Sequence, residues 1–534
     1  MPRPLAVRPP TIVIMLLLAV LLSPVAAVLA QTPVASPVPE SPGYRQADCM
    51  YELPTGLPAN EVECGWVTAP MYADGNQPGT VELPIIRVMA TTHSPAPEPL
   101  IILLGGPGQN MASVLPLFGD ELPLWSFMRE RQDVILFDQR GMGLARPSLS
   151  CPFERPTTDG RAPETDTNPG LALVMCGNDL RAEGTDITAF TTRHNAADID
   201  AIRIAMGYEQ VDLYGISYGS KLALSAMRDF PDSIRATVIA SPLPLEANPF
   251  LDQTVGFDAA LKQVWRACAA DPVCAADNPD PAGAFVAATE RLAAEPMTLS
   301  IPDVVTGKGF ELPVDDFQFL QIMYLGVFVG QVTPVLPYLV TSVAQGDDSI
   351  LRLMGPMFLM SGNLSLGAFF TYFCQDEVPF SPESATNSAE AKADLAAPLA
   401  GDSWVALGDQ VYQVCPMWKF PAADPVENQP VTSNEPLLII TGAFDPITPP
   451  ENGDIVAANF PNSEVVEFAA QGHDPASSDP DCANPIIAAF LTDPAAPVDA
   501  ACAADPIAFP TRGEIESQLA MPMASPVATP VAGS

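Results

Sequence analysis

The stretch VDLYGISYGSKLAL, residues 211–224, constrains the fold of this chain more than any other. An apolar run of strand type ends at Gly215, a lone serine follows as Ser217, and a segment with helical periodicity begins after Gly219. The pattern G-x-S-x-G between a strand and a helix is typical of a sharp, strained turn that exposes the serine hydroxyl above a sheet. A five-residue motif of this kind also occurs by chance in ordinary turns. The strand–turn–helix context nevertheless favours Ser217 as a nucleophile.

Apolar runs of strand length recur along the chain, each followed by turn residues. They lie at 81–90, 99–106, 133–141, 211–217, 235–242, 436–445 and 463–473. Helix-like segments, such as 195–207 and 220–230, lie between several of them. This alternation predicts an α/β fold with a mostly parallel central sheet that carries helices on both faces.

The interval from about 245 to 430 breaks the alternation. Its segments 257–270, 282–295 and 316–330 are helix-like, and buried-strand signals resume only at Leu437. We interpret it as a large helical cap insertion over the sheet. Apolar residues expected in its core include Phe317, Met323, Phe328 and Phe369.

The ends of the chain differ from its centre in composition, since both are rich in Pro and Ser. The expected organisation is a signal peptide at 1–30, a Pro/Ser-rich linker at 31–47, a first core part at 48–244, the helical cap at 245–430, a second core part at 431–510 and a low-complexity tail at 511–534.

The N-terminus has the pattern of an export signal. Arg3 and Arg8 precede the apolar stretch 11–22, and the small residues at 28–30 offer a cleavage site. The apolar stretch is shorter than the ~20 residues that a membrane-spanning helix needs, although an uncleaved anchor is the alternative. The mature protein is therefore expected to be secreted or at the cell surface, without stable membrane insertion.

Ten cysteines agree with export, because an even number in an oxidising compartment indicates disulfides. A zinc site is the rival interpretation, but the chain has no C-x-x-C pair and only 3 histidines. No motif suggests a metal or an organic cofactor. Short loops close at the least entropic cost, so the expected pairs are Cys49–Cys64, Cys151–Cys176, Cys268–Cys274, Cys374–Cys415 and Cys482–Cys502.

A serine hydroxyl is a weak nucleophile without a base. His93 lies in a polar turn and His194 at a helix start, whereas His473 directly follows a strand. His473 also comes after Ser217, as the chain order Ser…Asp…His requires. His473 is therefore the candidate base.

The acid of such a triad lies between the serine and the histidine and follows a strand. Asp445 stands just past a strongly apolar run, and Pro446 prevents that strand from continuing. A carboxylate there can orient the imidazole and stabilise its charged form. The rival acids are Asp454, Asp474 and Asp376.

The segment LLGGPGQN, residues 103–110, follows the second apolar run. Its glycines allow backbone N–H groups to approach a substrate, so the N–H groups of Gly106 and Tyr218 are the candidate oxyanion hole. Pro107 has no N–H. A plain tight turn is the alternative interpretation.

The motifs GGPG, DQRGMG, GISYGS, GAFDPITP and GHD occur in this order along the chain. In these motifs the sequence resembles the proline iminopeptidase and tripeptidyl aminopeptidase group of α/β-hydrolases, from about Cys49 to Cys502. Residues 482–502 look like the tripeptidyl-aminopeptidase-like C-terminal region. Leu104 is a departure, because the group often has histidine before GGPG.

The resemblance implies the α/β-hydrolase fold, the triad Ser217, Asp445 and His473, and cleavage of peptides at their N-termini. The expected function is an exported serine hydrolase that acts through an acyl-enzyme on a peptide or a small ester or amide. Acidic residues could bind the substrate amine, with Asp376 and Glu377 as candidates.

Two alternatives stay open at this point. One is an exported esterase or lipase with the same triad, and the other is a non-catalytic surface binding protein on a hydrolase scaffold. The formal net charge of −39 argues against nucleic acid or anionic lipid as a partner, since both need a positive surface.

Overall fold

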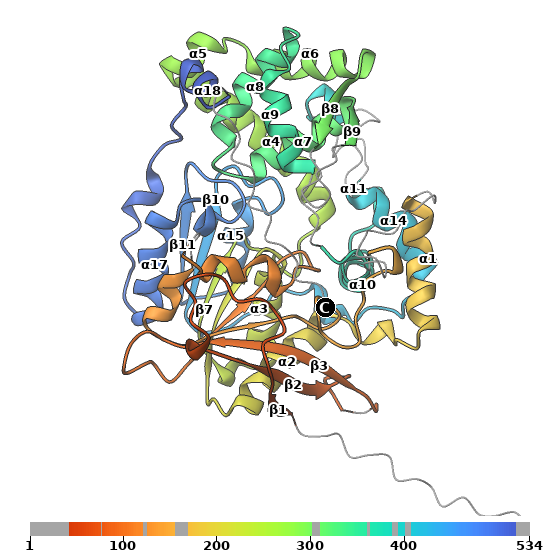
Figure 1. Ribbon diagram of the computed structural model, residues 1–534, viewed down its shortest axis with the longest axis vertical. Helices are drawn as coiled ribbons and strands as arrows, with labels where there is room; N and C mark the ends of the chain where they lie inside the picture. Colours follow the sequence, from red (N-terminus) through yellow and green to blue (C-terminus); the bar gives the residue numbers. More distant parts are fainter. Residues whose placement is uncertain are drawn as a thin grey trace, which may run out of the picture. The chain divides into compact units, whose positions relative to one another are not determined.

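The computed structural model describes residues 42–519, apart from 76, 121–124, 155–168, 302–309, 360–363, 387–393 and 401–406 (Figure 1). The expected signal peptide at 1–30, most of the expected linker and residues 520–534 lie outside the described residues.

A single large sheet forms the centre of the fold (Figure 1). In spatial order its strands are β1 (Gly43–Gln46), β2 (Val62–Pro70), β3 (Thr80–Val88), β5 (Val134–Phe137), β4 (Leu100–Leu103), β6 (Val211–Ile216), β7 (Ile234–Ala240), β10 (Leu437–Gly442) and β11 (Ser463–Phe468). The pairs from β1 to β5 are antiparallel, and the pairs from β5 to β11 are parallel. This confirms the expected mostly parallel α/β sheet.

The parallel strands are buried on both faces, which explains their nearly continuous apolar sequences. Because successive side chains of a strand point to opposite faces, Ile101 and Ile102 of β4 belong to different core clusters. Helices α2 (Thr192–Met206) and α3 (Tyr218–Asp229) pack into the cluster of Ile101, and α17 (Pro480–Thr492) packs into the cluster of Ile102.

The other α-helices of the described residues lie mainly in the interval expected as a cap. They are α1 (Pro169–Ala182), α4 (Pro249–Ala270), α5 (Pro272–Asp277), α6 (Pro281–Ala294), α7 (Asp316–Phe328), α8 (Leu336–Ala344), α9 (Ser349–Leu359), α10 (Leu366–Asp376), α11 (Glu383–Thr386), α13 (Ala397–Ala400), α14 (Leu407–Trp418), α15 (Glu451–Ala457), α16 (Pro475–Ser478) and α18 (Arg512–Leu519).

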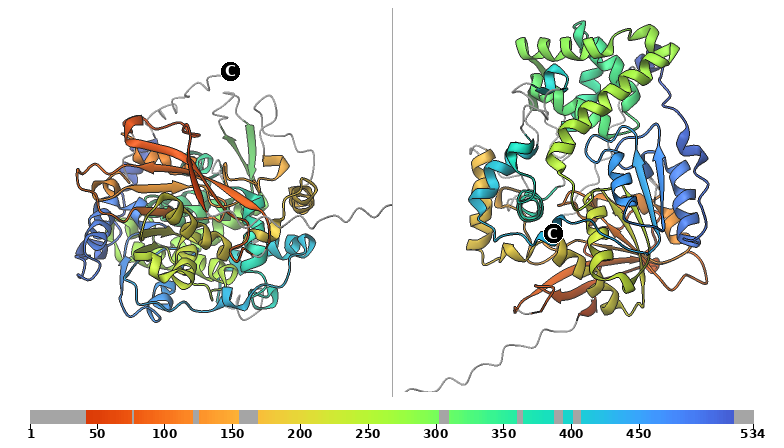
Figure 2. Two further views of the ribbon diagram at one scale, coloured as in Figure 1. Left: turned by 90° about the horizontal axis from the view of Figure 1, so that it is seen from below. Right: turned by 180° about the vertical axis from the view of Figure 1, so that it is seen from behind.

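The interval 245–430 divides into two packing groups. Helices α4 to α9 and the hairpin of β8 (Met297–Ile301) and β9 (Phe310–Val314) share a core cluster whose described residues include none from the strands of the central sheet, although α13, α18 and Phe444 also join it (Figures 1 and 2). Helices α10 and α14 instead pack beside α1 and join the core cluster of Ile101. The boundaries of the cap stay a prediction.

Several segments differ from the sequence-based expectations, among them β2, which was not expected as a strand, and the hairpin of β8 and β9, which lies in the interval expected as helical. Residues 43–46, expected as linker, form β1 and pair with β2 at the edge of the sheet. The apolar pattern of β2 is interrupted by Gly65 and ends at Pro70, and Gly and Pro weaken a strand signal. Residues 512–519, expected as tail, form α18.

All five expected disulfides are confirmed: Cys49–Cys64, Cys151–Cys176, Cys268–Cys274, Cys374–Cys415 and Cys482–Cys502. Among the described residues, no helix combines the length and the apolar character needed to cross a membrane.

Candidate active site

Ser217 lies at the turn between β6 and α3. Its torsions, φ 57° and ψ −123°, are strained for a residue with a side chain. Its N–H donates to the carbonyl of Ala240 in β7 at 2.9 Å and so holds the turn. A Cβ on Gly215 would lie 2.3 Å from the Gly219 carbonyl oxygen, and one on Gly219 would lie 1.9 Å from the Leu103 carbonyl oxygen. Both positions therefore require glycine.

Asp445 and His473 meet at the same end of the sheet. They follow the adjacent parallel strands β10 and β11, whose carboxyl ends point in one direction. His473 Nδ1 lies 2.8 Å from Asp445 Oδ2, and both side chains are buried. Because this contact occupies Nδ1, the second ring nitrogen, Nε2, is left for other partners.

Three further donors hold the Asp445 carboxylate. Its Oδ1 accepts hydrogen bonds from the backbone N–H groups of Ile447 and Thr448, each at 2.9 Å, and its Oδ2 accepts one from the Thr448 hydroxyl at 2.7 Å. Burial alone would raise the pKa of Asp445, but the charge of His473 and these hydrogen bonds hold that pKa below its ordinary value. The carboxylate is therefore charged at neutral pH.

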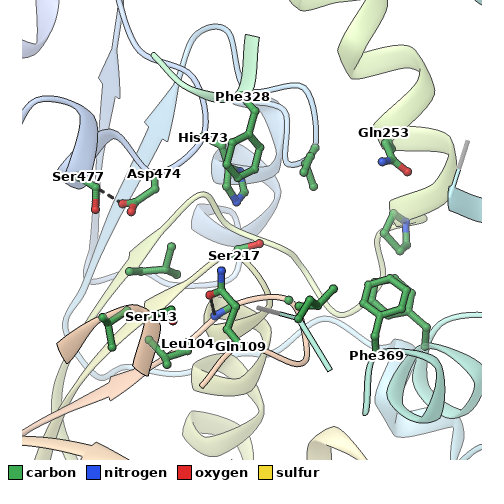
Figure 3. Close-up of a pocket in the computed structure, with 18 of the residues that line it drawn as sticks. Leu104, Gln109, Ser113, Ser217, Gln253, Phe328, Phe369, His473, Asp474 and Ser477 are labelled. Atoms are coloured by element: carbon green, nitrogen blue, oxygen red, sulfur yellow. Dashed lines mark hydrogen bonds between the residues drawn. The ribbon is translucent and has the colours of Figure 1, made fainter. Parts of the chain in front are cut away.

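A cavity of about 390 Å³ opens beside these residues (Figure 3). Ser217 and His473 both line it, and in the view of Figure 3 the serine side chain lies below the imidazole. Such an apolar wall with a few convergent polar groups is typical of a substrate site. The apolar lining residues are Leu104, Val114, Leu117, Trp125, Ile216, Pro249, Phe250, Phe328, Leu364, Phe369, Phe373 and Ile447.

The glycine loop after β4 forms the wall next to the serine. Gly105 and Gly106 both line the cavity, and a Cβ on Gly105 would lie 3.1 Å from the Ser217 Cβ. The N–H of Gly105 donates to Gln109 Oε1 at 3.1 Å. Among the described residues, no acceptor is found for the N–H of Gly106 or for that of Tyr218, the first residue of α3.

The end of α7 contacts the histidine. The Phe328 ring stacks on the His473 ring with centroids 4.5 Å apart. The backbone carbonyl of Phe328 also accepts a hydrogen bond from the backbone N–H of His473 at 3.0 Å. A Cβ on Gly472 would lie 2.3 Å from the Val327 carbonyl oxygen, so this glycine permits the close approach. A helix from the interval 245–430 therefore takes part in fixing His473.

The candidate amine site at Asp376 and Glu377 is not at this cavity. Neither residue belongs to its lining, and both are buried. Asp376 Oδ2 accepts hydrogen bonds from the N–H and the hydroxyl of Thr192, each at 2.7 Å, and Glu377 forms an ion pair with Lys221 of α3. These partners already satisfy the carboxylates, so we do not carry the amine assignment forward for this pair.

Sequence reasoning missed several residues of this site. Phe328 and Phe369 were expected in the cap core but line the cavity, whereas Met323 is buried in the separate core of α4 to α9. Periodicity cannot distinguish these roles, because a cavity wall and a core are both apolar. Thr448 could have been identified from the sequence, because it stands three residues after Asp445 in the motif GAFDPITP.

Two family models match the chain. The model described as alpha/beta hydrolase fold matches residues 98–279, and the model described as TAP-like protein matches residues 397–502.

Several known proteins are similar in sequence or structure. Serine protease Hip1 of Mycobacterium tuberculosis (strain ATCC 25618 / H37Rv) is 24% identical over 497 residues, which cover 87% of this chain and 90% of that protein. Tripeptidyl aminopeptidase of Streptomyces lividans is 30% identical over 226 residues, 38% of this chain and 40% of that protein. The crystal structure of proline iminopeptidase from Mycobacterium smegmatis has 15% identity and a TM-score of 0.38, covering 80% of this chain and 98% of that chain.

Proposed function

This chain is a serine hydrolase with the α/β-hydrolase fold and a TAP-like C-terminal region, and we propose that it removes residues or short peptides from free peptide N-termini. The names of its relatives, a serine protease and a tripeptidyl aminopeptidase, support peptide bonds as the target. The observation that carries the proposal is that Ser217 and His473 share one cavity while Asp445 holds the histidine at 2.8 Å.

In the first half of the reaction, His473 Nε2 takes the proton of Ser217 Oγ, which attacks the carbonyl carbon of the scissile bond. The N–H groups of Tyr218 and Gly106 stabilise the oxyanion that forms. His473 then gives its proton to the leaving amine, and the N-terminal fragment stays bound to Ser217 as an ester.

In the second half, His473 removes a proton from a water molecule, which attacks the acyl-enzyme. The released acid is the N-terminal residue or short peptide, and Ser217 recovers its proton from His473. Asp445 keeps its negative charge throughout and stabilises the imidazolium that forms in both halves.

Export is part of the proposal. Five disulfides support an oxidising compartment, where such bonds persist. We place the protein outside the cytoplasm, secreted or at the cell surface, and assign the interval 245–430 as the cap that limits the size of the substrate.

A substrate panel tests this function. Mono-, di- and tripeptidyl p-nitroanilides are compared in unblocked and N-acetylated form, together with p-nitrophenyl esters. The proposal expects the highest kcat/KM on an unblocked peptide. Hydrolysis of the esters alone would assign an esterase instead, and the Ser217→Ala variant controls for background hydrolysis.

A further inference from the structure

Asp474 is the carboxylate in the wall of the catalytic cavity. It directly follows His473 in the chain, and it is the acidic residue among the described residues that line this cavity (Figure 3). Apart from His473, none of the described residues that line the cavity is basic. The electrostatic character of the site therefore depends on one negative charge beside the imidazole.

The Asp474 carboxylate has no Lys or Arg partner among the described residues. Ser477 supplies its hydrogen bonds: the backbone N–H of Ser477 donates to the carboxylate at 3.4 Å, and the Ser477 side chain is a second donor. Burial raises the pKa of Asp474 above its ordinary value, although Ser477 and the charge of His473 act in the opposite direction. A cation in the cavity would relieve this cost of burying the charge.

The backbone, rather than a side-chain partner, fixes Asp474 in this position. Its torsions, φ 52° and ψ 69°, are left-handed, and its N–H donates to the Ser241 hydroxyl at 2.9 Å. Ser241 is itself left-handed, with φ 54°, and its N–H donates to the Ile440 carbonyl at 2.8 Å. Two residues with strained backbone torsions are thus hydrogen-bonded to each other at the carboxyl end of the sheet strands. Such strain is common at functional sites.

We propose that Asp474 binds the α-ammonium group of the peptide substrate by a charge-assisted hydrogen bond. This inference rests on the proposed aminopeptidase function and names the group that distinguishes a free N-terminus from a blocked one. The surrounding wall is apolar, so an unpaired ammonium would be poorly solvated there and the pairing is worth more than in water. Asp376 and Glu377 lack this role because their partners lie within the protein.

The Asp474→Asn variant tests the proposal. Asparagine keeps the size of the side chain and its ability to cap α16, but removes the charge. We expect the ratio of kcat/KM on an unblocked peptidyl p-nitroanilide to kcat/KM on its N-acetylated form to fall roughly 10- to 100-fold. Asp479→Asn is the matched control, because Asp479 caps the next helix, α17, and lies outside the cavity lining. In this control variant the ratio of the two kcat/KM values should stay at that of the wild type.

The pH profile gives a second readout that a purely structural role would not change. A peptide amine loses its proton at about pH 7.7–8.0. The wild-type kcat/KM on the unblocked substrate should therefore fall above that pH, and this fall should be absent in Asp474→Asn. A variant that keeps the wild-type ratio and pH profile overturns the proposal for Asp474 alone. Equal hydrolysis of both substrates by the wild type overturns the aminopeptidase function itself.

Discussion

At Ser217, the proposed chemistry depends on two neighbouring positions that have no room for a side chain. Gly219, in the first turn of α3, lies against the Leu103 carbonyl, and Gly215, next to the last residue of β6, lies against the Gly219 carbonyl. The turn that results leaves the hydroxyl on the cavity wall and the first N–H of α3 without an intrahelical acceptor. The same close packing that creates the reactive geometry also makes the turn intolerant of substitution.

The Gly219→Ala variant should lose both stability and activity. Its Cβ would lie 1.9 Å from a backbone oxygen, which cannot move without displacing β4. We expect a loss of ~3 kcal/mol or more in the free energy of unfolding, measured by urea denaturation. Gly513→Ala in α18 is the control, because a Cβ there meets nothing within 4 Å and should change stability by less than ~1 kcal/mol. Equal effects of both substitutions would contradict the steric account.

At the scale of elements, α7 holds the histidine loop. The ring of Phe328, at the C-terminal end of α7, stacks on the His473 ring, and the Phe328 backbone carbonyl accepts a hydrogen bond from the backbone N–H of His473. The position of the imidazole thus depends on a helix whose buried apolar side chains pack in the core cluster of α4 to α9. Movement of that group of helices would change the catalytic geometry directly.

The Phe328→Ala variant should lower kcat about 10- to 100-fold, because a small displacement of the base has a large effect on rate. The measurement is steady-state hydrolysis of a p-nitrophenyl ester, which needs no amine recognition. Leu325→Ala, one turn earlier in α7 and packed against the cap core, should lower stability but keep kcat. A Phe328→Ala enzyme with unchanged kcat would exclude α7 from positioning His473.

The disulfides join elements over loops of different length. Cys374–Cys415 connects α10 with α14 across 41 residues, whereas Cys268–Cys274 spans 6 residues. In the chain-entropy model, removing the first bond by paired Ser substitution should cost ~4 kcal/mol and removing the second ~2 kcal/mol. Urea denaturation of the two double variants tests this order, and a larger loss for the short loop would contradict it.

The sequence predicted the elements of the sheet centre well and its edge poorly. Strands β3 to β7 and β10 are recognisable in the sequence as apolar runs because the sheet is buried on both faces there. The strand β1 has only four residues, GYRQ, at the edge and lacks such a run. In the site, Ser217 could be predicted from its motif, and His473 from the small number of histidines in the chain. The position of Phe328 could not be predicted, because it depends on tertiary packing that no local pattern encodes.

At the scale of the whole molecule, a buried acidic cluster lies behind the catalytic turn. Glu427 and Asp376 line a second cavity of about 240 Å³, and Asp376 contacts Thr192, whose hydroxyl lies 3.0 Å from the Tyr218 hydroxyl. Burial, followed by the nearby charge of Asp376, raises the pKa of Glu427 to about 7. The sequence offered no sign of this cluster, because its members come from distant segments.

This cluster should make the fold more stable at acidic than at neutral pH. A carboxyl with a raised pKa binds its proton more tightly in the folded state, so its contribution declines as the pH rises from about 4.3, the unfolded value, to about 7. The Glu427→Gln variant should show a smaller decline over this range in urea denaturation. Asp424→Asn, exposed nearby, is the control. An identical pH profile for Glu427→Gln and wild type would refute the assignment.

The most direct test of the proposed catalytic site is covalent labelling of the folded protein with a fluorophosphonate probe, followed by peptide mass spectrometry. Such a probe reacts with a serine that a neighbouring base activates. We expect one adduct, on Ser217, that is lost in Ser217→Ala and strongly reduced in His473→Ala. An unlabelled protein, or an adduct on a different serine, would contradict the account.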